Sequence, residues 1–548
     1  MTRMQIEGMT CEGCAASVAD ALAGAGATLP RVDLDAGEAR FDAPGVAPEV
    51  LRAAVEAAGY RVVAIDDAVS PGRGPLHRRG PSRPSAPDLL VIGSGGAAFA
   101  AAIRARDLGA EVAMCEAATI GGTCVNIGCV PSKALLAAAG ARQVAAHHPF
   151  PGIATSAGPV DLAALVAGKD ELVDRLRFEK YEHLAEEYGF TLLCGRGSFI
   201  AADRFVCDGE EMAAGQFLLA TGASPAVPPV PGLAEAGYLT STTAFELREL
   251  PSSLVVIGAN AIGLEVGQLF SELGTSVTFV EAAGRIAPLD EPEISAALGD
   301  VLRRQGAQVH TSATVTGVAR RGARRAVTFS AGGSELEVEA DQVLVATGRR
   351  PNTAGLGLQA AGVALGARGE VVVDEFCSTS NPRIWAAGDV TGAPQFVYVA
   401  AAQGALAADN AIGKLGRSLD WTGLPRVTFT TPQIASVGPT EEEASRAGHR
   451  VETRVLALDA VPRALVERDT AGLCKIVAEE GSGRVLGVHL LAKGAGEVIL
   501  AATYAIKAKM TVTQLAETWA PYLTMAEALK LTAQTFTRDV SRLSCCAA

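Results

Sequence analysis

Two cysteines separated by four residues mark the segment best suited to chemistry. Cys124 and Cys129 lie in GGTCVNIGCVPSK, residues 121–133. At the start of a helix this spacing lets the two sulfurs form a small disulfide across about one turn. The helix dipole and Lys133 both favour the thiolate form. The pattern therefore predicts a redox-active pair rather than two structural cysteines.

The sequence GMTCEGC, residues 8–14, contains a second thiol pair, Cys11 and Cys14. It resembles the loop-to-helix thiol pair of heavy-metal-associated domains. Cys14 falls in the first turn of an expected helix, where the dipole and the exposed N–H groups favour a thiolate ready for a soft metal. The alternative, a redox motif of the thioredoxin type, lacks the expected Trp and Pro. A metal-binding module is the preferred interpretation.

A third pair, Cys545 and Cys546, lies in the terminal sequence LSCCAA. Vicinal thiols on a tail suit the capture of a soft metal ion. A prenylation motif is an alternative, but no polybasic segment precedes it, and an inert tail is another. Six of the eleven cysteines fall in these close pairs. No secretory signal is expected at the N-terminus, so we expect a cytoplasmic protein. In a reducing compartment such pairs indicate redox or metal chemistry rather than structural disulfides.

A glycine-rich turn follows the apolar run Leu89–Ile92 and contains Gly93, Gly95 and Ala98. The helix expected after it can hold a pyrophosphate at its N-terminus. Glu116 ends the next strand and can accept hydrogen bonds from ribose hydroxyls. Small residues also occur where helices merely pack on strands, but this order favours a dinucleotide site.

The same order recurs at Leu254–Ile257, with Gly258 and Gly263 in the turn and Glu281 after the next strand. Two dinucleotide-binding folds are implied. The Glu281 carboxylate suits the free 2′-hydroxyl of NADH and would repel the 2′-phosphate of NADPH. Arg285 can reach that phosphate only if its loop folds back. We expect NADH to be accepted at least as well as NADPH.

A later strand, Ile384–Ala387, runs into Gly388 and Asp389. Flavoproteins with two dinucleotide sites hold the ribityl chain and phosphate of FAD with this pattern. Thr221-Gly222 and Thr347-Gly348 end strands where the chain crosses between domains. Three ordinary strand–turn junctions are the alternative, but their order along the chain favours FAD as the first dinucleotide.

The order of elements predicts an α/β protein with several domains. Two Rossmann-like dinucleotide-binding domains are followed by a C-terminal α+β domain and preceded by a ferredoxin-like βαββαβ metal-binding domain. The C-terminal domain is expected to contain helices over residues 496–508 and 522–536. The predicted boundaries are 1–66 for the metal-binding domain, 67–87 for a flexible linker, 88–225 with 346–415 for the FAD domain, 226–345 for the NAD(P)H domain and 416–548 for the last domain.

The composition excludes several classes of protein. Hydrophobic residues make up 49% and charged residues 20%, so extensive disorder is excluded. The net charge is −13 and no basic stripe is present, so nucleic acid is not an expected partner. The longest uncharged stretches, 212–234 and 390–408, are interrupted by Gly, Pro and Gln, so no membrane insertion is expected. No secretory signal is expected either.

From residue 88 to about 536, the cysteine segment and the two glycine-rich turns resemble the pyridine nucleotide-disulphide oxidoreductases, the class of lipoamide dehydrogenase and glutathione reductase. The resemblance implies that Cys129 lies against the flavin and that Cys124 is the exchanging sulfur. Disulfide reductases of this class also carry a His-Pro-Thr segment whose His is a general acid. Here Ala520 stands at the corresponding position, which argues against a disulfide substrate. The implied FAD contacts are Gly93, Gly95, Ala98, Glu116, Thr123, Lys133, Asp389 and Val397.

Three features are similar to the mercuric reductase family: the Cys545/Cys546 tail, Tyr522, and Tyr181 in Phe178-Glu179-Lys180-Tyr181. In that family the tail receives Hg(II) and passes it to the redox pair of the other subunit, and tyrosines line the inner site. Hg(II) is soft, prefers two thiolates and moves by ligand exchange. A tyrosine alone is more often a packing residue, so the cysteine pairs carry this resemblance.

The resemblance implies a homodimer in which NAD(P)H reduces FAD and the electrons convert thiolate-bound Hg(II) to Hg(0). Mercury would be captured at Cys11 and Cys14, as well as at the tail. Two alternatives remain open: a disulfide reductase acting on lipoamide, glutathione or another thiol, and a metal-binding chaperone whose large core only recycles its thiols.

Overall fold

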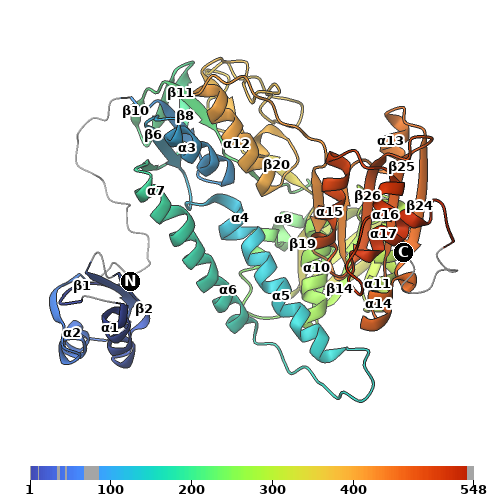
Figure 1. Cartoon of the computed structure of the whole chain (residues 1–548), viewed down its shortest axis with the longest axis horizontal. Coiled ribbons are helices and arrows are strands. Elements are labelled where there is room, and N and C mark those ends of the chain that lie inside the picture. The colour runs from blue at the N-terminus through green and yellow to red at the C-terminus, as the bar shows by residue number, and fades with distance from the viewer. Residues whose placement is uncertain (1, 10–11, 34–36, 44–45, 67–85, 540–548) are drawn as a thin grey trace. The chain divides into compact units, whose positions relative to one another are not determined.

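The computed structural model covers the chain of 548 residues and describes residues 2–9, 12–33, 37–43, 46–66 and 86–539. It separates into two compact units, Met1–Arg83 and Pro84–Ala548, each with its own fold (Figure 1). Cys11, Cys545, Cys546 and nearly all of the predicted linker lie outside the described residues.

The N-terminal unit has the element order βαββαβ. Its four strands form an antiparallel sheet in the order β2-β3-β1-β4. Apolar residues of the strands and of α1 and α2, including Met4, Val18, Leu22 and Phe41, form its buried core. Cys14 lies in the first turn of α1 and is half-buried. The ferredoxin-like prediction is therefore confirmed. The bounds are β1 Thr2–Glu7, α1 Glu12–Gly24, β2 Thr28–Asp33, β3 Glu38–Asp42, α2 Pro48–Ala57 and β4 Arg61–Asp66.

The first dinucleotide-type sheet of the second unit has the strand order β21-β11-β5-β6-β7, with every pairing parallel. Helices α3 and α12 pack closely against each other, and a Cβ added at Gly404 would lie 2.1 Å from the Ala97 carbonyl oxygen. An antiparallel sheet, β8 to β10, lies between β7 and β11 in the chain. The bounds are β5 Leu89–Ile92, α3 Gly96–Asp107, β6 Val112–Glu116, β7 Thr191–Cys194, β8 Gly197–Ala201, β9 Arg204–Cys207, β10 Glu210–Met212, β11 Gln216–Leu219, β21 Ile384–Ala386, η2 Asp389–Thr391 and α12 Val397–Ala411.

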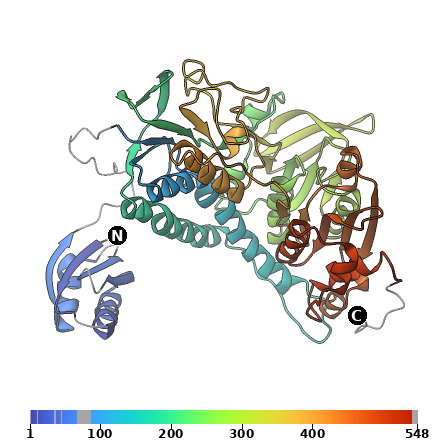
Figure 2. The same cartoon turned by 45° about the horizontal axis from the view of Figure 1, so that its top comes forward.

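A helical segment connects β6 to β7. Helix α5 packs against α6 and α10, and Figures 1 and 2 both show α5 and α6 side by side. Asp161 caps α6 by accepting a hydrogen bond from Ala164 N at 3.0 Å. The bounds are α4 Gly122–Ile127, α5 Cys129–Ala146, α6 Leu162–Arg177, the π-helical turn η1 Phe178–Glu182 and α7 His183–Glu187.

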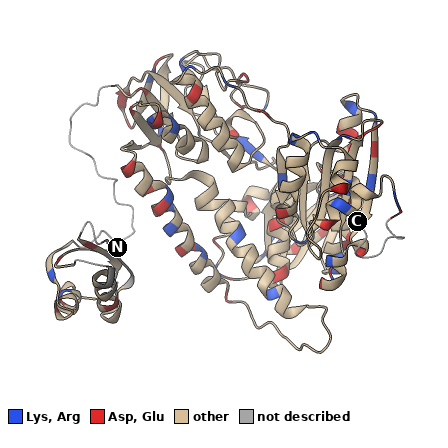
Figure 3. Cartoon of the chain, viewed as in Figure 1, with Lys and Arg blue, Asp and Glu red and all other residues tan. Residues whose placement is uncertain are grey.

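One stretch of the described residues is long and apolar enough to cross a membrane. It is Gly122–Ala146, in which one window of 18 residues has a mean hydropathy of 1.3, and it was not predicted from the sequence. Figure 3 shows few charged residues on α5 compared with α6. This stretch contains the cysteine pair and packs against α6 and α10. Core helices of globular proteins have the same composition, so this property is weak evidence for a membrane span.

The second dinucleotide-type sheet has the parallel order β15-β14-β13-β19. Helix α10 is almost entirely buried against it, and a Cβ at Gly267 would lie 2.4 Å from the Phe279 ring. Strands β16 to β18 form an antiparallel sheet beside it. The bounds are β12 Ala223–Pro225, α8 Leu233–Ala236, α9 Ser241–Ala244, β13 Ser253–Ile257, α10 Ala261–Leu273, β14 Ser276–Val280, α11 Pro292–Arg304, β15 Gln308–His310, β16 Ala313–Arg321, β17 Arg324–Ala331, β18 Ser334–Ala340, β19 Gln342–Val345 and β20 Arg349–Pro351.

The C-terminal domain has an antiparallel sheet in the order β22-β23-β26-β25-β24. The prediction of one helix over residues 522–536 is wrong at its start, because α17 begins at Glu527. Leu523 adopts a φ of +59°, outside the helical region, and its N–H donates to Glu527 at 2.8 Å. The bounds are β22 Pro425–Thr428, β23 Gln433–Val437, α13 Glu441–Arg446, β24 Val451–Ala457, η3 Leu458–Ala460, α14 Pro462–Glu467, β25 Leu473–Glu479, β26 Val485–Ala492, α15 Ala495–Lys507, α16 Val512–Glu517 and α17 Glu527–Gln534.

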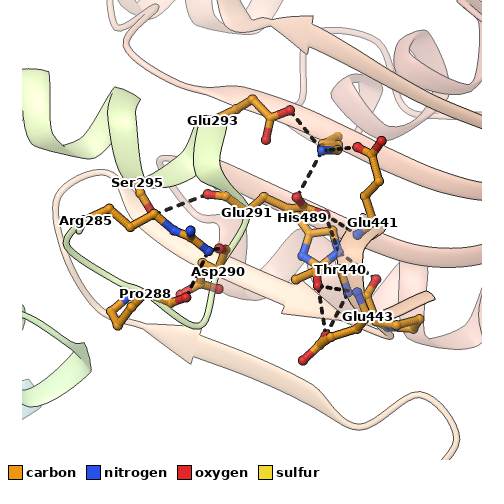
Figure 4. A network of polar contacts seen from close by, with 12 residues as sticks. Arg285, Pro288, Asp290, Glu291, Glu293, Ser295, Thr440, Glu441, Glu443 and His489 are labelled. Carbon is orange, nitrogen blue, oxygen red and sulfur yellow. Dashed lines mark hydrogen bonds and ion pairs between the residues drawn. The ribbon is translucent and has the colours of Figure 1, made fainter. Parts of the chain in front are cut away.

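A buried polar network joins this domain to the second dinucleotide-type domain (Figure 4). The Lys475 side chain is 2% exposed, and its Nζ lies 3.0 Å from Glu291, 2.9 Å from Glu293 and 2.8 Å from Glu441. Glu291 and Glu293 lie at the start of α11, whereas Lys475 and Glu441 belong to the C-terminal domain, so these ion pairs link the two domains.

Candidate active site

The two cysteines of the 121–133 segment lie where two helices meet. Cys124 is in α4, and Cys129 is the first residue of α5, after the break at Gly128. A hydrogen bond from the Cys124 thiol and the charge of Lys133 lower the pKa of Cys129 to about 7, although burial opposes the shift. The same hydrogen bond and burial raise the pKa of Cys124. Cys129 is therefore the sulfur that is ionised near neutral pH.

Lys133 connects this pair to distant parts of the chain. Its Nζ lies 2.7 Å from Glu265 Oε2 on α10 and 4.4 Å from the centre of the Phe429 ring. Glu265 Oε1 also accepts a hydrogen bond from Phe429 N at 2.8 Å. The ammonium group is thus fixed one helical turn after Cys129. The sequence analysis missed Glu265, since its only signal is its position two residues after Gly263.

The first glycine-rich turn leaves no room for a side chain at Gly93, nor at Gly122 beside it. A Cβ at Gly93 would lie 2.4 Å from the Ala220 carbonyl oxygen. A Cβ at Gly122 would lie 2.6 Å from the Cα of Gly95, so the turn also touches the start of the cysteine segment. This close approach of backbone leaves N–H groups near the N-terminus of α3, where a pyrophosphate can bind. The residues present therefore fit a dinucleotide such as FAD.

Glu116 supports that turn. Its Oε2 accepts a hydrogen bond from Ser94 Oγ at 2.5 Å, and its Oε1 accepts one from Ala118 N at 2.7 Å. Ser94 was not predicted as a site residue. Its hydroxyl also accepts a hydrogen bond from Gly121 N at 3.1 Å, so it links the turn to the cysteine segment. Ala98 is fully buried in α3.

Asp389 and Val397 approach the same region from the late part of the sequence. The Asp389 carboxylate lies 3.7 Å from Arg349, which the sequence analysis did not identify. Burial raises the pKa of Asp389, and the Arg349 charge partly offsets this effect. Val397 begins α12, and its Cγ2 lies 3.1 Å from the position of a Cβ at Gly96. Segments far apart in sequence thus meet beside the first turn.

The second glycine-rich turn is equally tight. A Cβ at Gly258 would lie 2.6 Å from the Ala346 oxygen, and one at Gly263 would lie 1.9 Å from the Gly258 oxygen. Glu281 accepts hydrogen bonds from Ala259 N at 2.6 Å and from Ala283 N at 2.8 Å. This site has the same construction as the one around Glu116, and it fits a second dinucleotide.

The Arg285 side chain is hydrogen-bonded within its own loop (Figure 4). Its Nη2 donates hydrogen bonds to the carbonyl oxygens of Pro288 at 3.0 Å and Asp290 at 3.1 Å. In this arrangement the guanidinium group is committed to loop carbonyls. Glu281, the residue directly after β14, is therefore the charged side chain at this end of the second dinucleotide-type sheet.

The two predicted tyrosines lie on different domains. Tyr181 belongs to η1, which follows α6 rather than the cysteine-bearing helices, and its ring packs at right angles to Phe99 with centroids 4.8 Å apart. Burial raises the pKa of Tyr181, with smaller contributions from Cys124 and Cys129, and its ring lies 3.3 Å from the position of a Cβ at Gly121, at the start of the cysteine segment. Tyr522 is 50% exposed on the C-terminal domain, between α16 and α17.

Family models match most of the chain. Residues 87–404 match the pyridine nucleotide-disulphide oxidoreductase model, and residues 424–533 match the dimerisation domain of the same proteins. Residues 3–61 match the heavy-metal-associated domain. The fold and the cysteine site therefore define a flavoprotein of the pyridine nucleotide-disulphide oxidoreductase class.

Similar proteins identify the family within this class. The mercuric reductase of Staphylococcus aureus is 48% identical over 545 residues, which cover 100% of this chain and 99% of the relative. The mercuric reductase of Streptomyces lividans is 54% identical over 466 residues, 84% of this chain and 98% of the relative. The chain belongs to the mercuric reductase family, as its cysteine pairs predicted.

Solved structures show the same fold. The HOCl-induced flavoprotein disulfide reductase RclA from Escherichia coli is 31% identical, with a TM-score of 0.72, and the match covers 80% of this chain and 98% of that one. LpdA from Mycobacterium tuberculosis is 29% identical, with a TM-score of 0.74, and the match covers 82% of this chain and 100% of that one. The predicted fold class is thereby confirmed.

Proposed function

We propose that the chain reduces thiolate-bound Hg(II) to Hg(0) with NAD(P)H through FAD, and so detoxifies mercury. The single observation that carries this proposal is a full-length match to mercuric reductases in a chain whose Cys129 is held as the low-pKa member of a close pair. Hg(II) is a soft ion that favours two thiolates. Cys124 and Cys129 supply two sulfurs, and Cys129 is ionised near neutral pH.

In the proposed mechanism, Cys124 and Cys129 bind Hg(II) after losing their protons. Two electrons reduce the ion to Hg(0), and its two sulfur bonds break to leave thiolates. FAD, when bound, carries these electrons from the nicotinamide. Lys133 keeps positive charge beside Cys129, and the hydroxyl of Tyr181 positions the metal or assists exchange of its ligands. The residues proposed to hold FAD are Gly93, Gly95, Ala98, Glu116, Thr123, Lys133, Asp389 and Val397, and those proposed for NAD(P)H are Gly258, Gly263 and Glu281.

Delivery of mercury uses the other two thiol pairs in this proposal. Cys11 and Cys14 capture Hg(II) on a separate unit, which raises its local concentration near the core. Cys545 and Cys546 hand the ion to the Cys124/Cys129 pair of a second subunit, with Tyr522 near the entry. The match of residues 424–533 to a dimerisation domain supports a homodimer with a shared site. We place the enzyme in the cytoplasm, where thiols stay reduced.

The decisive experiment follows NAD(P)H oxidation by the purified holoenzyme with HgCl2 and excess small thiol, and measures mercury vapour at the same time. We expect one Hg(0) for each NAD(P)H consumed. The parallel substrates are lipoamide and oxidised glutathione. Mercury-independent oxidation of NAD(P)H, with no vapour, would falsify the proposed reaction.

A disulfide reductase is the second candidate, because the flavoprotein disulfide reductase RclA shares the fold at 31% identity. Ala520 stands where disulfide reductases of this class have a general-acid His, so protonation of a thiol leaving group is impaired. We expect turnover of disulfides to be far below turnover of Hg(II). Efficient reduction of lipoamide by the same preparation would support the second candidate instead.

The role of the tail can be tested separately. Replacing Cys545 and Cys546 by Ala should cripple turnover of Hg(II) held by bulky thiols and spare turnover of small, accessible complexes. Equal loss, or no loss, for both kinds of complex would contradict the proposed hand-off.

The preference between nicotinamides rests on Glu281 and Arg285. The Glu281 carboxylate accepts hydrogen bonds from Ala259 N and Ala283 N, and Arg285 donates to the carbonyl oxygens of Pro288 and Asp290. We propose that NADH is used at least as well as NADPH, and that Glu281→Ala shifts preference toward NADPH. The ratio of kcat/KM for the two cofactors measures this. A preference for NADPH of about tenfold, roughly 1.4 kcal/mol, would contradict it.

A further inference from the structure

A second pair of sulfurs lies in close contact outside the proposed active site. Cys115 Sγ and Cys207 Sγ are 2.9 Å apart, although the residues are 92 positions apart in the chain. Cys115 is on β6, the strand next to the edge strand β7 of the first dinucleotide-type sheet, and Cys207 ends β9. The two side chains are 3% and 5% exposed, within an apolar cluster that includes Phe205 and Phe217.

The geometry is close to that of a bonded pair. A disulfide places its sulfurs about 2.05 Å apart, so Sγ atoms at 2.9 Å need to approach by less than about 1 Å. Both strands are held in register by their sheets, with Cys115 paired to Ile92 and Cys207 paired to Gly197. The sulfurs are thus positioned by backbone that is already ordered.

A third thiol lies on the other face of the same sheet. Cys194 ends β7, is exposed, and pairs across the parallel ladder with Glu116, the residue after Cys115. Because successive side chains of a strand alternate between the two faces, Cys194 and Glu116 face away from the Cys115/Cys207 contact. Burial raises the pKa of Cys115, and the hydrogen bond and charge of Cys207 add to this effect. Cys115 therefore reacts more slowly than a thiolate at neutral pH.

We propose that Cys115 and Cys207 are a second redox pair, which forms a disulfide by exchange with a small-molecule disulfide at the end of β9. Cys207 loses its proton, attacks the small disulfide, forms a mixed disulfide and releases one small thiol. Cys115 then loses its proton, attacks the Cys207 sulfur and releases the second small thiol.

Two protein thiols are oxidised overall, and one small disulfide is reduced to two thiols. The bond would link β6, which carries Glu116, to β9. Because Glu116 holds Ser94 of the glycine-rich turn, the link stabilises the proposed FAD site.

The test uses the full-length holoenzyme in glutathione buffers of increasing oxidised fraction, followed by acid quenching, alkylation and peptide mapping. The expected result is a linked Cys115–Cys207 peptide that excess reduced thiol removes. The Cys124–Cys129 peptide is the positive control in the same digest, and the fully buried Cys474 is the control for unspecific oxidation. Separate alkylation of Cys115 and Cys207 in buffers that fully link Cys124 to Cys129 overturns the proposal.

Cys194→Ser is the control for the exposed thiol on the other face of the sheet. It should change neither the rate at which the linked peptide appears nor its final yield in each buffer. A slower appearance in this variant overturns direct exchange at Cys207. The wild-type mapping does not depend on any substitution, so a variant that folds poorly leaves the main test intact.

Discussion

Two cysteine pairs of this chain are both close enough to react, and they differ in the charges around them. Cys129 begins a helix and has Lys133 one turn away, and its pKa falls to about 7. Cys115 lies within a sheet beside Glu116, and its pKa is raised by burial and by negative neighbours. A helix N-terminus and a cation stabilise a thiolate, whereas a strand interior and a carboxylate do not.

Proximity of two sulfurs alone does not make a cysteine pair suited to rapid metal exchange. Both pairs can form a disulfide on geometric grounds, but only the Cys124/Cys129 pair offers a thiolate near neutral pH. The remaining buried cysteines follow the same rule, since burial raises the pKa of Cys377 to about 12 and that of Cys474 to about 12. Burial thus makes these cysteines poor ligands for soft metals at neutral pH.

The largest effect is expected from Cys129→Ser. It removes the reactive thiolate, so kcat/KM for Hg(II) should fall by about 1000-fold or more, with FAD still bound. The matched control is Cys207→Ser, which changes one sulfur of the other pair and should keep kcat/KM within about twofold of wild type. Comparable losses in the two variants would break the distinction between the pairs.

A smaller loss is expected from Lys133→Met, which removes the cation but keeps a side chain of similar length. Without that charge the pKa of Cys129 should rise above its wild-type value of about 7. In the wild type the thiolate should be half-formed at about pH 7 and disappear as the pH falls. The long-wavelength absorbance of the reduced holoenzyme, followed against pH, measures both values.

Lys133→Arg is the control for this prediction, since it keeps the positive charge. The pKa of Cys129 in Lys133→Arg should be closer to the wild-type value than the pKa in Lys133→Met. If both variants shift the pKa of Cys129 equally, the positive charge at position 133 is not what lowers it. FAD content is measured in each variant, because Lys133 is also a proposed cofactor contact.

The third effect concerns stability rather than turnover. Cys207→Ser places a hydroxyl in an apolar cluster and removes the contact with Cys115, so the free energy of unfolding should fall by about 1–2 kcal/mol. Thermal unfolding of the reduced holoenzyme should show a lower Tm, while Cys194→Ser, at an exposed position, should leave it nearly unchanged. Equal destabilisation by both variants would contradict the packing argument.

The smallest effect is expected from deletion of residues 1–66. This segment forms its own compact unit with its own core, so the remaining chain should reduce small Hg(II) complexes with kcat/KM within about twofold of the full chain. Steady-state kinetics of the two proteins measures it. A tenfold loss would show that the first unit takes part in core turnover rather than in capture alone.

Much of the candidate site could be predicted because its chemistry is local. The Cys124/Cys129 spacing, the GMTCEGC segment and the two glycine-rich turns each place their groups within one or two helical turns. Backbone geometry is then enough to say which atoms can meet. The βαββαβ order and the two dinucleotide folds follow from the same local patterns, and both are confirmed.

Two other features could not be predicted from the sequence, for physical reasons. Glu265 lies 132 positions after Lys133, and only the packing of α10 on α5 brings them to 2.7 Å. The helix expected from Tyr522 begins instead at Glu527, because a left-handed residue in the preceding turn is not evident from composition.

The sequence by itself determined the reactive cysteine pair, the glycine-rich turns and the family, because these depend on neighbouring residues. The tertiary structure alone decided which charges surround each sulfur. Cys115 and Cys207 meet only because β6 and β9 belong to sheets packed on a shared core, and Arg349 meets Asp389 for the same kind of reason. Charge and burial act through space, so the pKa of a thiol depends on chain segments far from it in sequence.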